Sequence, residues 1–173
     1  MQKPEIYDLE EILNDFEQNI ASFIELCKDK IVVFDFDGTL TKFKYEKNRL
    51  LPCLQKDVLE YTLAGGNIYH TTTVLKTMQY IISKLNMNNL WVLTTSYPQL
   101  RDIKSKIIHQ HFNIPLERII HSNSDLHKVE LLKNIHSTTY KKIIFVEDTV
   151  NTLLAAEDNL DFVEGYHISS LLA

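Results

Sequence analysis

Residues 31–40 read IVVFDFDGTL, an apolar run that ends in an acidic turn. The run is short, rich in β-branched residues and apolar on both faces, which is typical of a central strand in a parallel sheet. Asp35 and Asp37 end it, and Gly38 follows as a turn residue. A buried strand of this kind predicts an α/β fold with polar side chains at one edge of the sheet.

Further apolar runs lie along the chain, and helical patterns separate them. Strands are expected at residues 90–95, 118–121 and 142–147, with a weaker one at 161–168. Helices are expected at residues 74–85, 100–111, 128–135 and 153–158. This alternation predicts a single Rossmann-like α/β domain, in which helices cover both faces of a parallel sheet and the crossovers are right-handed.

Two segments fall outside this alternation. Residues 41–70 contain Pro52 and a Gly-Gly-Asn turn signal, and we interpret them as a small insertion after the first strand, with a short helix near Gln55–Leu63. Residues 1–29 hold an amphipathic helix over 4–28, whose apolar stripe either packs on the domain, which we favour, or forms a dimer contact. We therefore treat residues 1–173 as one domain with these two additions.

Composition narrows the class of protein. The chain has 173 residues, of which 45% are hydrophobic and 24% charged, as in soluble globular proteins, so disorder, collagen and coiled coil fit poorly. No apolar run approaches the roughly 20 residues of a membrane span, and the first residues lack the pattern of a signal peptide. The net charge of −5 argues against nucleic-acid binding. Cys27 and Cys53 cannot form a disulfide framework, so a cytoplasmic protein is expected.

Polar residues stand where the predicted strands end. They are Asp35 and Asp37, Thr94 and Thr95, and Glu147 and Asp148, while Lys128 opens the helix before the fourth strand. Because the carboxyl ends of parallel strands meet at one edge, these side chains are expected to converge. Clustered carboxylates repel one another unless a hard cation such as Mg²⁺ compensates them. An ammonium beside such a metal favours phosphoryl transfer to a carboxylate.

These motifs, in this order, resemble those of the haloacid dehalogenase superfamily of phosphotransferases. The matching stretches are DFDGTL (35–40), VLTTS (92–96), HKVELL (127–132) and IFVED (144–148). The acidic pair in the last stretch is similar to that of the β-phosphoglucomutase and phosphoglycolate phosphatase branch. The resemblance covers residues 30–168 and implies strand order 5-4-1-2-3, counted over the five predicted strands, with a minimal cap after the first.

The resemblance also implies a role for each site residue. Asp35 would be the nucleophile, and Asp37 the general acid and then the base, with its backbone carbonyl on the metal. Mg²⁺ would be held by Asp35, Asp37, Glu147 and Asp148. The transferring phosphate would be bound by Lys128 and by Thr94, with Thr95 as the open alternative to Thr94. Thr152 departs from the pattern, because many relatives carry a further Asp there.

Each motif also has a plain structural interpretation. Asp37-Gly38 is typical of a β-hairpin, Glu147-Asp148 of a helix N-terminus, and the two threonines of a strand end. Lys128 is the least specific of the motif residues, because a lysine in the first turn of a helix is ordinary. The occurrence of all four motifs in order favours the functional interpretation.

We therefore expect a hydrolase, a Mg²⁺-dependent phosphatase of phosphomonoesters. One alternative is a phosphomutase of the same superfamily, against which the small cap argues, because a mutase must exclude water. The other is a non-catalytic protein that binds a phospho-ligand on the same fold, against which the retained acids argue. The expected partner is a phosphorylated substrate of unknown identity. We expect no binding to nucleic acid or to a membrane, and the chain is expected to be a monomer or a homodimer.

Overall fold

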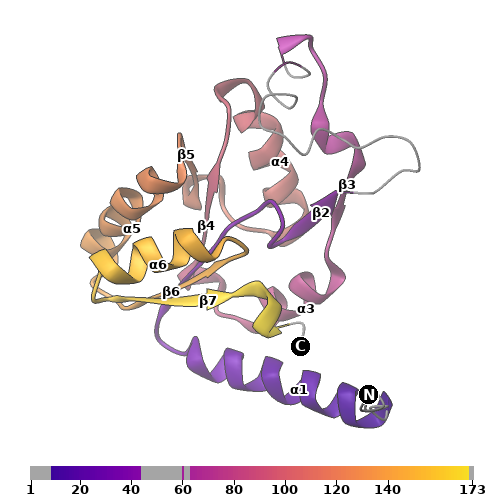
Figure 1. Ribbon diagram of the computed structural model, residues 1–173, viewed down its shortest axis with the longest axis vertical. Coiled ribbons are helices and arrows are strands. Elements are labelled where there is room, and N and C mark those ends of the chain that lie inside the picture. The colour runs from indigo at the N-terminus through magenta and orange to yellow at the C-terminus, as the bar shows by residue number, and fades with distance from the viewer. Residues whose placement is uncertain (1–8, 44–59, 61–62, 172–173) are drawn as a thin grey trace, which may run out of the picture.

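The computed structural model describes residues 9–43, 60 and 63–171, and it is an α/β structure built on a five-stranded parallel sheet (Figure 1). The sheet strands are β1 (Ile31–Phe34), β4 (Leu90–Thr95), β5 (Ile119–Ser122), β6 (Ile143–Glu147) and β7 (Val163–His167). Two short strands, β2 (Thr41–Phe43) and β3 (Thr72–Val74), form a separate antiparallel pair. The helices are α1 (Leu9–Leu26), α3 (Lys76–Lys84), α4 (Arg101–Phe112), α5 (Asp125–Thr139) and α6 (Val150–Asn159).

The first strand lies at the centre of the sheet. The order is β5-β4-β1-β6-β7, and every pairing in it is parallel. The expected order 5-4-1-2-3 was written with numbers for the five predicted strands alone. The labels used here also count β2 and β3, so the two notations differ. The loop that follows β1 therefore lies between the loops that follow β4 and β6.

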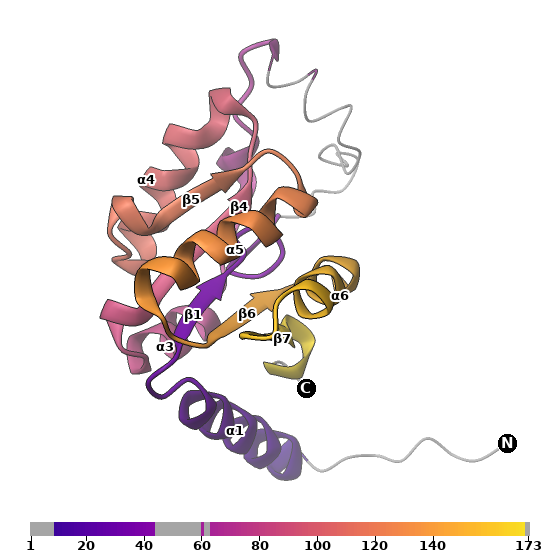
Figure 2. The ribbon, with the colours of Figure 1, turned by 90° about the vertical axis from the view of Figure 1, so that its left-hand side faces the viewer.

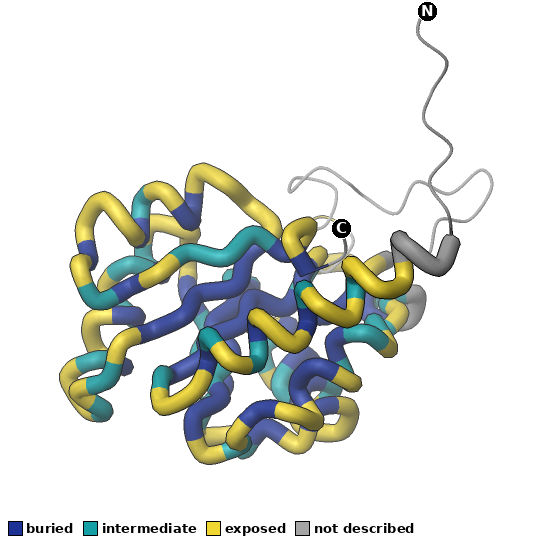
Figure 3. Tube along the Cα trace, turned by 90° about the horizontal axis from the view of Figure 1, so that it is seen from below, coloured by how far each residue is buried: buried dark blue, intermediate teal, exposed yellow. Residues whose placement is uncertain are grey.

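Residues of β1 alternate between two hydrophobic cores. Val32 and Phe34 belong to the core with α3 and α4, and Val33 belongs to the core with α5 and α6. Figures 1 and 2 show α5 and α6 on one side of the strands and α3 and α4 on the other. The tube in Figure 3 shows the buried strands in the interior and exposed residues on the outer sides of the helices. This double burial explains why the strands read as uninterrupted apolar runs.

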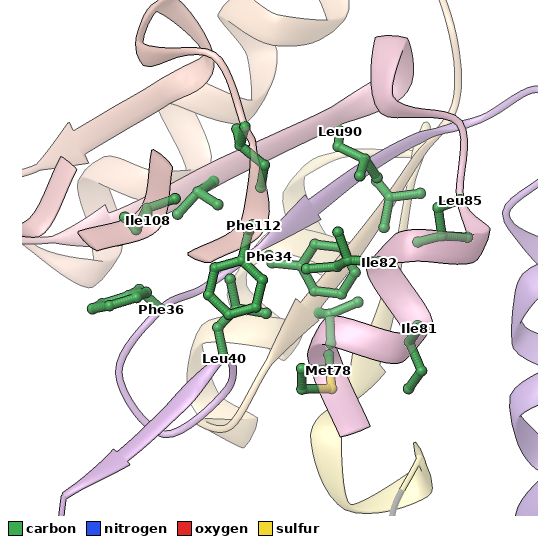
Figure 4. Packing of buried hydrophobic residues seen from close by; sticks show 14 of the residues in the cluster. Phe34, Phe36, Leu40, Met78, Ile81, Ile82, Leu85, Leu90, Ile108 and Phe112 are labelled. Carbon is green, nitrogen blue, oxygen red and sulfur yellow. The ribbon is translucent and has the colours of Figure 1, made fainter. Parts of the chain in front are cut away.

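The core on the α3 side is aromatic and aliphatic. Phe34 and Phe112 lie close to Met78 and Ile82 of α3 in Figure 4, and all four are at most 3% exposed. Each such side chain contributes about 1.5–3 kcal/mol through burial. The packing holds α4 against the sheet, and α4 carries one of the site residues described below.

Several elements end at places that differ from the sequence prediction. The strand expected at 31–36 stops at Phe34, because the Phe36 carbonyl accepts the backbone N–H groups of Leu40 and Thr41 in a tight turn. The helix expected at 128–135 begins at Asp125, where the Ser124 hydroxyl caps it. The helix expected near Gln55–Leu63 lies almost wholly outside the described residues.

Helix α1 packs against the domain at the end of the sheet where β1 begins (Figure 2). Its buried residues include Ile20 and Phe23, and the Phe23 ring lies 4.8 Å from that of Tyr166. Hairpin β2–β3 encloses the greater part of the insertion predicted at 41–70. Among the described residues, none of the helices is both long and apolar enough to cross a membrane.

Candidate active site

The site begins in the turn after β1. Asp35 is 4% exposed, and its backbone N–H donates to the Val146 carbonyl at 2.9 Å, which extends the pairing with β6 by one residue. Gly38 has φ +83°, and a Cβ there would overlap the carboxylate of Asp148. Glycine therefore permits both the left-handed turn and the close approach of the loop after β6.

Three carboxylates meet where β1 and β6 end. Asp35, Glu147 and Asp148 each offer an oxygen, and these oxygens lie within 4.8 Å of one another. The strands are direct neighbours, with Phe34 beside Val146, so their carboxyl ends open at the same place. Asp35 and Glu147 are buried and Asp148 is exposed, so the group has a dry side and a side open to solvent.

Lys128 connects two of these acids. Its Nζ donates to Asp35 Oδ1 at 2.8 Å and to Glu147 Oε2 at 2.7 Å. The side chain is 3% exposed, and the nearest further carboxylate is Asp125, at 3.9 Å. Lys128 lies on the first turn of α5, where the Ser124 hydroxyl accepts from the backbone N–H of His127. Lys128, whose sequence signal is the least specific of the motif residues, is therefore buried among the acids.

Burial disfavours the charged forms of the clustered acids. Burial, opposed by the charges of Lys128 and Lys104, raises the pKa of Asp35 to about 6. Burial and then the charge of Asp35 raise the pKa of Glu147 to about 8. Burial favours the neutral amine of Lys128, but the two carboxylates outweigh this and raise its pKa above the ordinary value. Because one ammonium does not balance the acids, a bound cation would relieve the repulsion.

A second buried lysine, Lys104, was not singled out from the sequence. Its Nζ lies 2.7 Å from Asp37 Oδ2 and donates to Thr94 Oγ1 at 2.7 Å and to the Thr95 carbonyl at 2.8 Å. Lys104 shares the buried side of α4 with Ile108 and Phe112. The sequence does contain a signal for it, because Lys104 falls on the apolar stripe of this helix. Lysine is almost never fully buried without a partner, so a lysine in that position indicates a buried polar contact.

The two candidate threonines join different networks. Thr94 is 1% exposed and belongs, through Lys104, with Asp37. The Thr95 hydroxyl instead donates to Asp125 Oδ1 at 3.0 Å and lies 2.9 Å from the Ser122 hydroxyl. Neighbouring residues of a strand point to opposite faces, which separates the two side chains. Thr94 is the one that shares a partner with Asp37.

His167, at the end of β7, was also missed. Its Nε2 lies 2.9 Å from the Asp148 carbonyl, and the backbone N–H of Ser169 donates to its Nδ1 at 3.2 Å. Since Nδ1 accepts, the ring proton lies on Nε2, which therefore donates to the Asp148 carbonyl. His167 thus fixes the loop that carries Asp148.

The donor set suits a hard divalent cation. Its atoms are carboxylate oxygens, which Mg²⁺ prefers, and the site keeps an exposed side on which waters or a phosphate can complete the coordination. Asp35, Glu147 and Asp148 could hold such an ion with their side chains. The carboxylate of Asp37 pairs with Lys104 instead, so its expected contribution to the metal remains its backbone carbonyl.

No family model matches the chain, and no curated protein or solved structure matches it either.

Proposed function

We propose that this protein is a Mg²⁺-dependent phosphomonoester phosphatase of the haloacid dehalogenase superfamily, acting through an aspartyl phosphate on Asp35. The observation that supports this most is the meeting of Asp35, Glu147 and Asp148 within 4.8 Å, with Lys128 bridging the first two. The motif residues come from distant parts of the chain. If each had only a local structural role, such as ending a strand or capping a helix, nothing would require their side chains to meet.

The strand order supports the same assignment. With the hairpin strands set aside, the parallel strands number one to five along the chain as β1, β4, β5, β6 and β7. Read from the β7 edge, the observed sheet then has the order 5-4-1-2-3 that the resemblance implies. In this arrangement the nucleophile follows the central strand, between the threonine loop and the acidic loop.

In the first step, a carboxylate oxygen of Asp35 attacks phosphorus and forms a P–O bond, while the bond from phosphorus to the ester oxygen breaks. Asp37 gives a proton to the departing oxygen. Lys128 stabilises the negative charge around Asp35, and the Thr94 hydroxyl donates a hydrogen bond to an oxygen of the phosphoryl group.

In the second step, water replaces the enzyme oxygen. Asp37, now a carboxylate, takes a proton from the water as its oxygen bonds to phosphorus. The bond between phosphorus and the Asp35 oxygen breaks, and inorganic phosphate leaves. Mg²⁺, when bound, neutralises the acids and the phosphate oxygens, which lets an anionic nucleophile approach an anionic ester.

The test is turnover of a panel of phosphate esters, including p-nitrophenyl phosphate, with Mg²⁺ and with EDTA. Asp35→Asn is expected to lower kcat by more than about a thousandfold while the circular dichroism spectrum is unchanged. The control is Asp158→Asn, an exposed acid of α6, which should leave turnover intact.

Two results would overturn the proposal. One is turnover by Asp35→Asn above about a thousandth of wild type, which would exclude covalent catalysis by Asp35. The other is the absence of turnover with every ester together with no binding of Mg²⁺ or beryllofluoride, as a non-catalytic protein would show. Transfer of labelled phosphate to a sugar in preference to water would identify the phosphomutase alternative.

A further inference from the structure

We propose that Lys104 is a positioning residue that holds the general acid Asp37 and the hydroxyl of Thr94 in a single arrangement. This inference rests on the proposed function and adds to it a residue outside the four motifs.

Lys104 has no hydrogen left for a substrate. The side chain is 0% exposed, and its Nζ is within 2.8 Å of three acceptors: Asp37 Oδ2, Thr94 Oγ1 and the Thr95 carbonyl. An ammonium has three hydrogens and no acceptor, so these contacts use its full capacity. Lys104 therefore acts through its neighbours and does not touch the phosphate.

One effect falls on Asp37. Lys104 holds Oδ2, while Oδ1 is buried and has no hydrogen-bond partner among the described residues. A carboxyl group anchored by one oxygen holds its second oxygen in a fixed place, and no other hydrogen bond among the described residues competes for Oδ1. Without Lys104, the Asp37 side chain, which is 34% exposed, could rotate towards solvent and lose this placement.

The other effect falls on Thr94. Its Oγ1 accepts a hydrogen bond from Lys104, and lysine cannot accept one in return. The hydroxyl proton of Thr94 is thus directed away from Lys104 and is available to a phosphoryl oxygen. One ammonium therefore couples the turn after β1 to the loop after β4.

The surroundings keep the ammonium in place. It lies 5.6 Å from the ring centre of Phe36 and 5.9 Å from that of Tyr69, within the range of a cation–π contact with both rings. The next residue, Ser105, contacts His121 Nε2 at 2.8 Å, and His121 Nδ1 contacts the Ser96 hydroxyl at 3.0 Å. These bonds tie α4 to the ends of β4 and β5, so Lys104 is held by a rigid helix.

The experiment compares Lys104→Met with Lys106→Met, an exposed lysine of the same helix. Two substrates are used: p-nitrophenyl phosphate, whose leaving group needs little protonation, and glycerol 2-phosphate, whose alkoxide needs a proton. With Lys104→Met, kcat/KM, which reports only the first step, should fall about 100-fold on glycerol 2-phosphate and no more than about tenfold on p-nitrophenyl phosphate. Lys104→Arg should lie between wild type and Lys104→Met, and Lys106→Met should match wild type.

A binding measurement complements the kinetics. Vanadate with Mg²⁺ mimics the transferring phosphoryl group, and calorimetry should show it bound about tenfold more weakly by Lys104→Met, because the Thr94 hydroxyl is no longer oriented. A merely structural role would lower the folded fraction and thus both kcat/KM values by one factor, without changing their ratio.

The outcomes separate the two proposals. If wild type hydrolyses neither ester, the proposed function fails. If wild type is active but Lys104→Met keeps the wild-type ratio of the two kcat/KM values, the positioning role is overturned and the proposed function stands. If Lys104→Met does not fold, Lys104→Arg carries the same comparison, and an unchanged ratio in that variant overturns the inference.

Discussion

Gly38 shows how one residue serves both the backbone and the acidic cluster. Its φ of +83° lies in the region that favours glycine, and a Cβ would overlap the Asp148 carboxylate. Gly65 has nearly the same φ, +82°, but a Cβ there would meet nothing within 4 Å. Substitution of Gly65 therefore changes stability through the backbone conformation alone, whereas substitution of Gly38 also disturbs the contact with Asp148.

Gly38→Ala is expected to lower the free energy of unfolding by about 1–3 kcal/mol and to weaken Mg²⁺ binding, because Asp148 must move. Gly65→Ala should carry only the backbone cost, about 1 kcal/mol, with Mg²⁺ affinity unchanged. Urea unfolding and titration calorimetry measure the two quantities. Equal losses in both variants with unchanged Mg²⁺ binding would contradict the role given to Gly38.

At the scale of elements, α5 places Lys128 by the way it begins. The Ser124 hydroxyl accepts from the His127 N–H at 3.2 Å, so the first turn is capped and Lys128 is the next residue along. The helix starts three residues earlier than the apolar pattern suggested, because capping and not hydrophobicity sets its N-terminus.

Ser124→Ala should cost about 1 kcal/mol of stability through loss of the cap. Ser137→Ala is the matched control, since the exposed Ser137 hydroxyl bonds, among the described residues, only to the Asn134 carbonyl of the same helix. Its effect should stay within about 0.5 kcal/mol. Guanidinium unfolding of both variants decides the matter, and equal stabilities would show that the cap contributes nothing to α5.

At the scale of the whole molecule, the site joins segments separated by more than a hundred residues. Asp35 follows β1 and Glu147 ends β6, and only the pairing of these strands brings the two carboxylates together. The folded chain therefore contains an acidic cluster that the unfolded chain lacks. An ion held by this cluster must stabilise the fold, since it binds the native state alone.

Mg²⁺ at a hundredfold excess over its dissociation constant should raise stability by about 2.7 kcal/mol. For a chain of this size, that corresponds to an increase in Tm of about 5–10 °C. Asp148→Asn should abolish most of the increase, while Asp158→Asn should retain it. Differential scanning calorimetry with EDTA and with Mg²⁺ tests this, and a Tm that ignores Mg²⁺ in wild type would refute a metal site.

The apolar runs were sufficient to predict the α/β class and the places of the parallel strands. The residues 90–95 match β4, and 142–147 differ from β6 by one residue. Prediction succeeded here because burial on both faces leaves an uninterrupted apolar signal in the sequence. The acids at the strand ends were equally visible, since Asp35 and Asp148 directly follow their strands and Glu147 ends β6.

The tertiary structure alone decided which distant side chains contact the acidic loops. Lys104 lies on α4 and pairs with Asp37 after β1, and His167 reaches the Asp148 carbonyl from the last strand. Neither contact leaves a local pattern, because both depend on how α4 and β7 pack on the sheet. The tendency to form a strand depends on residues that are adjacent in the sequence, so it can be recognised there. A long-range ion pair forms only when packing brings its two residues together and removes them from water.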